Sequence, residues 1–177
     1  MSLSESWRTS QTTTDLDKAR PPVPQKSGIP PWLRAWWPAL AWALVITVFS
    51  TDTFSSAHTS IIIEPIIRWF YPSISHAELE FAHHIIRKCA HFTEYFIFFM
   101  LLYHGIRATR RNPPAWHWSW ALLAWIIAAV YSLFDEFHQT FVPSRGASLW
   151  DSALDSTAAL IALIVLFCFY RFRRRST

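Results

Sequence analysis

The sequence predicts an all-α membrane protein, a bundle of four transmembrane helices with an extra interfacial or re-entrant helix in the first outer loop. Charged residues make up only 16% of the 177 residues, and 52% are hydrophobic, whereas soluble globular domains average about 25% charged. The apolar residues lie in long runs, and the chain has eleven tryptophans, a residue type that gathers at bilayer interfaces. These features exclude a soluble enzyme with a polar shell.

The two ends of the chain have a different composition from the middle. Residues 1–31 are polar and rich in proline, which favours extended backbone, so we expect a disordered cytoplasmic tail. Residues 171–177 are basic and predict a second, short cytoplasmic tail. The transmembrane domain is therefore expected to cover residues 32–170.

Four apolar runs predict the membrane-spanning helices. They cover approximately residues 36–50, 89–106, 115–134 and 152–170. The first run is short for a span of about 20 residues, so its helix is expected to begin near Trp32, with Arg34 reaching the headgroups. Because glycine is almost absent from these runs, the helices are expected to pack through Ala, Ser and Thr.

The outer connection between the first two runs contains a further apolar segment. Residues 61–71 are too few to span a bilayer, carry Glu64 and Arg68 at i,i+4 spacing, and are interrupted by Pro65. We interpret them as an interfacial or re-entrant helix that lies against the bundle. Ser75 and Glu78 have the spacing of a capping box, which predicts a helix that starts there and runs into the second span.

The basic residues predict the orientation of the chain. Twelve of the 16 Lys and Arg lie before the first span, between the second and third, or after the fourth. The positive-inside rule makes that side cytoplasmic, with both termini inside.

Ionisable residues inside membrane helices are costly and usually mark a functional site. Three predicted spans carry polar stripes at helical spacing near their outer ends. The stripes are His84, Arg87, Lys88, His91, Glu94 and Tyr95; Ser132, Asp135, Glu136 and Gln139; and Ser148, Asp151, Ser152 and Asp155. We expect them to converge on one outward-opening pocket, with Arg145 above it on a short turn.

The predicted ligand-binding residues are Arg87, Lys88, His91, Glu94, Tyr95, Asp135, Glu136, Gln139, Arg145, Asp151 and Asp155. Alternatively, ion pairs such as Lys88–Asp135 or Arg145–Asp151 only fix the helix register. No metal site is expected, because Lys88 and Arg145 would repel a cation, and no other cofactor is indicated. Two cysteines in different spans predict no disulfide.

Two segments of the chain resemble the VanZ-like family of small bacterial membrane proteins. Residues 87–98 (RKCAHFTEYFIF) resemble the family pattern K-x-x-H-F-x-x-Y, and residues 135–155 resemble D-E-x-x-Q-x-F-x-P-x-R followed by D-x-x-x-N. Asp155 stands where the family has Asn, and Ser144 where Gly is common. The resemblance implies a four-helix membrane domain, a cell-envelope role and a link to resistance against the glycopeptide teicoplanin, but it supplies no reaction.

Together with this resemblance, the sequence favours a multi-pass protein of the bacterial plasma membrane with an outward-facing polar pocket. The pocket is expected to bind an amphipathic envelope molecule, such as a lipid headgroup or a lipid-linked cell-wall component. Lys88 and Arg145 would contact its anionic groups, and the carboxylates would orient it. One alternative is an enzyme that acts on a lipid headgroup, with His91 and an acid as general acid and base. Another is a small proton-linked carrier. Membrane lipids are the expected partners, and the charge pattern does not suit nucleic acid.

Overall fold

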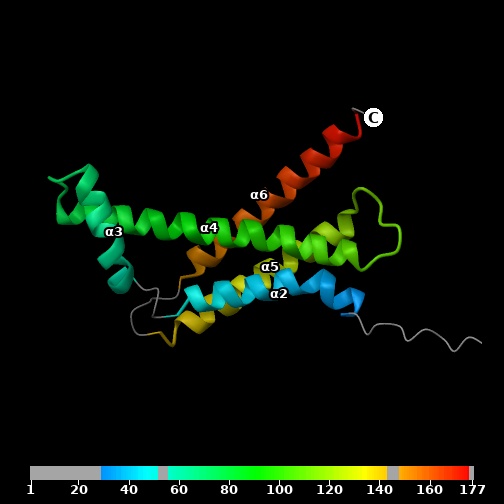
Figure 1. The fold of residues 1–177 in the computed structure, drawn as a ribbon, viewed down its shortest axis with the longest axis horizontal. Coiled ribbons are helices and arrows are strands. Elements are labelled where there is room, and N and C mark those ends of the chain that lie inside the picture. Colours follow the sequence, from blue (N-terminus) through cyan, green and yellow to red (C-terminus); the bar gives the residue numbers. More distant parts are fainter. Residues whose placement is uncertain (1–28, 52–55, 143–147, 176–177) are drawn as a thin grey trace, which may run out of the picture.

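A computed structural model describes residues 29–51, 56–142 and 148–175, with the backbone alone for residues 56–59 and 62. In these ranges all regular secondary structure is helical and there is no strand, which confirms the predicted all-α class. The helices are α2 (Pro31–Phe49), α3 (Ser56–Phe70), α4 (His76–Ala108), α5 (Trp118–Gln139) and α6 (Leu149–Arg173) (Figure 1). The predicted tail of residues 1–28 lies outside the described residues.

Helix α4 is the central element of the fold. Helices α2, α5 and α6 pack on it, and α3 contacts it near its N-terminal end, beyond the ends of α2 and α5 (Figure 1). With 33 residues, α4 is about 50 Å long, well beyond the hydrocarbon core of a bilayer, which is about 30 Å thick. The N-terminal part of α4 and α3 therefore form a projection from one end of the bundle.

The start of α4 is fixed by the predicted capping box. The Glu78 backbone N–H donates to Ser75 Oγ over 3.3 Å, and the Ser75 backbone N–H donates to Glu78 Oε2 over 2.9 Å. The helix then continues without a break into the apolar second segment, as predicted.

Other helix limits differ from the expected ones. Helix α5 begins at Trp118 and runs to Gln139, and α6 extends from Leu149 to Arg173, so both helices include polar or basic ends that hydropathy alone leaves out. Pro65 does not interrupt its segment, because α3 continues through it to Phe70. A proline removes one backbone donor, but α3 nevertheless continues past it.

The core combines large side chains on α4 with alanines on its neighbours. Tyr95, Phe98, Phe99 and Tyr103 of α4 are buried. The alanines that they face are also fully buried, at positions 121, 124 and 128 of α5 and 158, 159 and 162 of α6. The expectation that the helices pack through small residues is confirmed for α5 and α6.

Within the described ranges, three helices are long and apolar enough to cross a membrane, namely α2, α5 and α6. Helix α4 is longer than these three and carries the polar stripe in its middle. The apolar side chains that these helices expose, such as Leu44, Leu122 and Ile164, suit contact with lipid. These observations fit a membrane protein.

Candidate functional site

A cluster of buried polar side chains lies at one end of the bundle, where α2 and α5 end and α6 begins beside the middle of α4 (Figure 1). We call it the polar cluster. It consists of Ser50, Lys88, His91, Glu94, Ser132, Asp135, Glu136, Gln139, Asp151, Ser152 and Asp155. All except Lys88 and Asp151 are more than nine-tenths buried.

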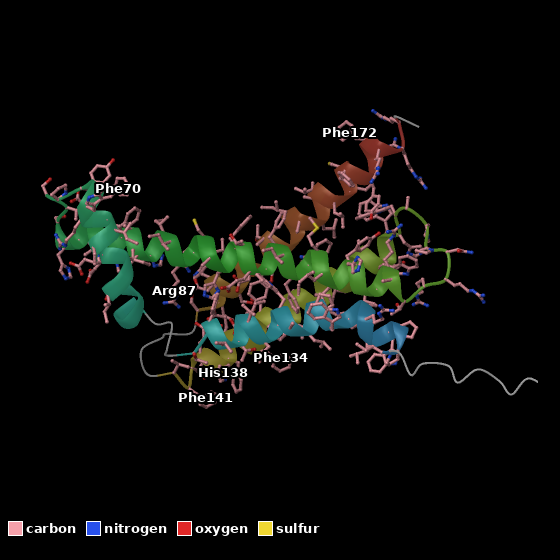
Figure 2. The ribbon with its side chains drawn as sticks, viewed as in Figure 1. Phe70, Arg87, Phe134, His138, Phe141 and Phe172 are labelled. Carbon is pink, nitrogen blue, oxygen red and sulfur yellow. The ribbon has the colours of Figure 1, made fainter. Side chains whose placement is uncertain are left out.

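The end of α5 shows why these groups are inside. Asp135, Glu136 and Gln139 lie on its buried face, whereas Phe134, His138 and Phe141 point away from the bundle (Figure 2). This helix end is apolar outside and polar inside, the reverse of a helix in a water-soluble protein. Such a pattern suits a helix that has lipid on one side and a polar site on the other.

Asp135 is held by donors from two helices. Ser50 at the end of α2 donates to Asp135 Oδ2 over 2.8 Å, and Gln139 Nε2 donates to the same oxygen over 3.1 Å. Gln139 Nε2 also lies 3.5 Å from Ser50 Oγ. This part of the polar cluster ties α2 to the last turn of α5.

Asp155 is the centre of a second group of contacts. Ser132 Oγ of α5 lies 3.1 Å from Asp155 Oδ2 and 3.0 Å from Ser152 Oγ. On the other side, His91 Nδ1 of α4 lies 3.6 Å from Asp155 Oδ1, which is within ion-pair range but longer than a hydrogen bond. Asp155 therefore joins three helices at a fully buried position.

The rest of the polar cluster lies closer to its edge. Lys88 of α4 forms an ion pair with Asp151 in the first turn of α6, and both side chains are partly exposed. The Ser148 backbone N–H, just before α6, donates to Glu136 Oε2 over 2.8 Å. A carboxylate near the N-terminus of α6 also suits the helix dipole.

The polar cluster contains more acids than bases in the part of the chain that the structure describes. Glu94, Asp135, Glu136, Asp151 and Asp155 stand against Lys88 and His91. Three deeply buried acceptor atoms have no hydrogen-bond donor among the described residues: Glu136 Oε1, Gln139 Oε1 and Asp155 Oδ1. Buried polar atoms are normally paired, so these atoms can receive donors from a bound molecule.

The structure brings together nine of the eleven sequence-predicted site residues, if Tyr95, fully buried on the same face of α4, is counted. Arg87 is separate from them, because it lines a cleft between α3 and α4. Arg145 lies outside the described residues. The partner of Lys88 is Asp151 and not Asp135, since the first turn of α6 lies closer to that part of α4.

Three serines of the polar cluster were absent from the predicted site. Ser132 and Ser152 belong to the recognised stripes, and their helical spacing was the available signal. Ser50 had no such signal, because one serine at the end of an apolar run is typical of a helix boundary. In the residues described, no group of three or more His, Cys, Asp or Glu has the arrangement of a metal site.

The family comparison matches the part of the chain that forms this bundle. The VanZ/LLP1 family model covers residues 35–170, from early α2 to late α6. The chain belongs to the VanZ/LLP1 family. That match includes every described residue of the polar cluster, and it confirms the resemblance that the two motifs indicated. Comparisons with curated proteins and with solved structures give no match.

Proposed function

We propose that this VanZ/LLP1 family member binds an amphipathic or lipid-linked molecule of the bacterial cell envelope, with its polar head in the polar cluster. The observation that carries the proposal is a set of buried acceptor atoms that have no hydrogen bond among the described residues. They are Glu136 Oε1, Gln139 Oε1 and Asp155 Oδ1, and the last has only the longer contact of 3.6 Å with His91 Nδ1. Each of the two carboxylates has a donor on its other oxygen. Burying the remaining oxygens without a donor is costly, so these atoms on α5 and α6 favour a ligand that supplies donors. The link to glycopeptide resistance is part of this proposal.

The charge of the polar cluster indicates which chemical groups the polar head of the ligand carries. Lys88 is already paired with Asp151. Among the described residues, the buried atoms of this region without a hydrogen bond are three carboxylate or amide oxygens, together with Tyr95 Oη and His91 Nδ1, and the acids outnumber the bases. A head with amine, amide or hydroxyl donors therefore fits better than a purely anionic one. An anionic group on the same ligand would lie nearer the edge, beside Lys88.

Native mass spectrometry of the detergent-released protein tests this proposal. We expect the unmodified chain to release a bound molecule of constant mass. Asp155→Asn and Glu136→Gln should lose it, because each replaces an acceptor oxygen by a donor. Glu78→Gln is the matched control, since it makes the same chemical change on an exposed carboxylate. Equal occupancy in all four proteins would reject the site.

The membrane topology is a second part of the proposal. We propose that α2, α4, α5 and α6 all cross the bilayer, that both termini are cytoplasmic, and that the polar cluster lies toward the outside. In a chain without Cys89 and Cys168, cysteines at positions 56 and 148 should react with an impermeant reagent in intact cells. A cysteine at position 176 should react only after lysis, and its labelling in intact cells would reverse the orientation.

A catalytic function is a second candidate, favoured by one contact. His91 lies 3.6 Å from Asp155, an arrangement in which the carboxylate can orient a histidine that transfers protons. Glu94 and Asp135 lie in the same cluster and are alternative acids. If the chain is an enzyme, His91→Gln should abolish turnover of the bound molecule while leaving its binding nearly unchanged.

A further inference from the structure

A second polar site lies outside the polar cluster, between α3 and the projecting part of α4. This α3–α4 cleft has a volume of about 480 Å³, which is in the range of ligand pockets. The residues that line it include Glu64 on α3 and His76, Glu80, His83, His84 and Arg87 on α4. The α4 residues share one face of the helix over about three turns.

The α3–α4 cleft is lined by a basic residue at one end and by acidic residues away from it. Arg87 lies at the end nearer the bundle and makes no ion pair with the described residues. Glu80 lies seven residues earlier, about 10 Å along the helix axis. Glu64 is neutralised by Arg68 at 2.8 Å, and Glu80 contacts His76 at 3.5 Å. A ligand with an anionic and a cationic group would match this arrangement.

His83 provides a second observation that points to a ligand-binding site. Its Nε2 atom is buried and has no hydrogen-bond partner among the described residues, although the side chain lines the cleft. His84 lies one position further on, also in the lining. Imidazole nitrogens donate to phosphate when protonated, so His83 and His84 can assist the Arg87 guanidinium.

The surroundings of the cleft are apolar. Outside the lining, α3 exposes Ile61, Ile66 and Trp69, and the facing part of α4 exposes Phe81 and Ile85. Figure 2 shows the α3 end, with Phe70, projecting away from the bundle, whereas Arg87 lies closer to it. A polar cleft with apolar outer surfaces, on a protein with helices that can span a membrane, suits a lipid rather than a free solute.

We infer that the α3–α4 cleft binds the phosphoethanolamine headgroup of a bilayer phospholipid, with the phosphate on Arg87, His83 and His84 and the ammonium near Glu80. This site is independent of the polar cluster and of the function proposed for it. The ammonium donates N–H bonds to a carboxylate, which a quaternary ammonium cannot do. The described lining has no Phe, Tyr or Trp that would favour a choline by cation–π contact.

Lipid binding to the delipidated full chain tests the inference. We would titrate phosphatidylethanolamine, phosphatidylcholine and phosphatidylglycerol of identical acyl chains and follow bound lipid by native mass spectrometry. Phosphatidylethanolamine should bind about tenfold more tightly than the other two, because only it offers both charges and N–H donors. Equal affinity for the three lipids would overturn the inference without any variant.

Two substitutions and a control test the residues. Arg87→Gln should weaken phosphatidylethanolamine and phosphatidylglycerol alike, by about tenfold, since both carry the phosphate. Glu80→Gln should weaken phosphatidylethanolamine alone and so remove the selectivity. Arg110→Gln, at the opposite end of the protein, is the matched control and should change nothing.

The outcomes separate this inference from the function proposed above. Asp155→Asn should leave phosphatidylethanolamine affinity unchanged, whereas Arg87→Gln should leave the ligand of the polar cluster unchanged. If Arg87→Gln behaves like Arg110→Gln, the cleft is not the headgroup site. If Arg87→Gln does not fold, Arg87→Lys keeps the charge and should retain most of the affinity, while Glu80→Gln still tests the selectivity.

Discussion

The two ends of the helical bundle solve the same packing problem in different ways. At one end, Asp135, Asp155 and their neighbours bury carboxylates among serines. At the other end, Tyr103, Trp116 and Phe167 pack their rings together, with centroid distances of 5.2 Å and 5.4 Å around Trp116. Burying the carboxylates costs free energy, because they lose their contacts with water. Burying the aromatic rings lowers the free energy of the folded state.

The basic residues sharpen this difference. At the aromatic end, Arg107 lies 5.7 Å from the ring centre of Tyr170 and Arg110 lies 5.9 Å from that of Trp120. Such cations over rings are typical of the membrane interface, where one side of the ring is apolar and the other is wet. The arrangement of the aromatic end therefore suits a segment that holds the bundle at the membrane interface. The polar end has buried groups that stability alone does not explain.

The largest expected effect is at the aromatic end. Tyr103→Ala should lower the free energy of unfolding by about 4 kcal/mol, because it removes a buried ring from the stack. Thermal unfolding in detergent measures this loss, and the ligand of the polar cluster should still co-purify. Loss of the ligand from a folded Tyr103→Ala protein would show that the two ends are coupled.

A smaller loss is expected for the ion pair at the edge of the polar cluster. Lys88→Met should cost about 3 kcal/mol, the lower end of the range for removing one partner of a buried pair, since Lys88 and Asp151 are partly exposed. The double variant Lys88→Met with Asp151→Leu should recover most of that loss. If the two single losses simply add, Lys88 and Asp151 do not interact in the folded protein.

Removing a single neutral donor should cost less. Ser50→Ala leaves Asp135 Oδ2 with Gln139 as its remaining donor, so we expect a loss of about 1–2 kcal/mol. Chemical unfolding in detergent measures it. Thr51→Ala is the control and should have almost no effect, because the exposed Thr51 hydroxyl donates to the Val48 carbonyl and to no other described residue.

The smallest effect concerns pH at the start of α4. The Ser75 hydroxyl and backbone N–H donate to the Glu78 carboxylate and lower its pKa. A carboxyl whose pKa is lower when folded stabilises the fold above its unfolded pKa, and this contribution disappears as the pH falls through the lowered value. Hydrogen exchange of the first α4 turn should therefore speed up in acid, after correction for the intrinsic rate. Glu78→Ala should show no such change.

The sequence predicted the parts of the structure that depend on periodicity. Ser75 and Glu78 start α4 as their spacing indicated, and Lys88, His91, Asp135 and Asp155 meet because each lies on a helical stripe. Which acid pairs with Lys88 was beyond the sequence, because it depends on the rotation and tilt of α6 against α4. The continuity of α3 through Pro65 also differs from the expectation, since the low helix propensity of proline had predicted a break there.

The separation of Arg87 from Lys88 has a similar cause. Neighbouring residues on a helix point about 100° apart, so Arg87 lines the α3–α4 cleft while Lys88 reaches α6. From the sequence alone both residues were assigned to one stripe, because both fit its helical spacing. Helix α3 was expected to lie against the bundle. It lies instead on the projecting part of α4, which gives that surface its own lining.

The most direct test of the central claim, that the polar cluster is a ligand site, measures melting temperature and retained ligand on one preparation of Asp155→Asn. The substitution keeps the shape of the side chain and removes one of the excess buried negative charges. We predict that the melting temperature stays the same or rises by about 2–4 °C, while the co-purifying ligand is lost. A fall of many degrees with the ligand fully retained would contradict the account, because Asp155 would then serve only to hold α4, α5 and α6 together.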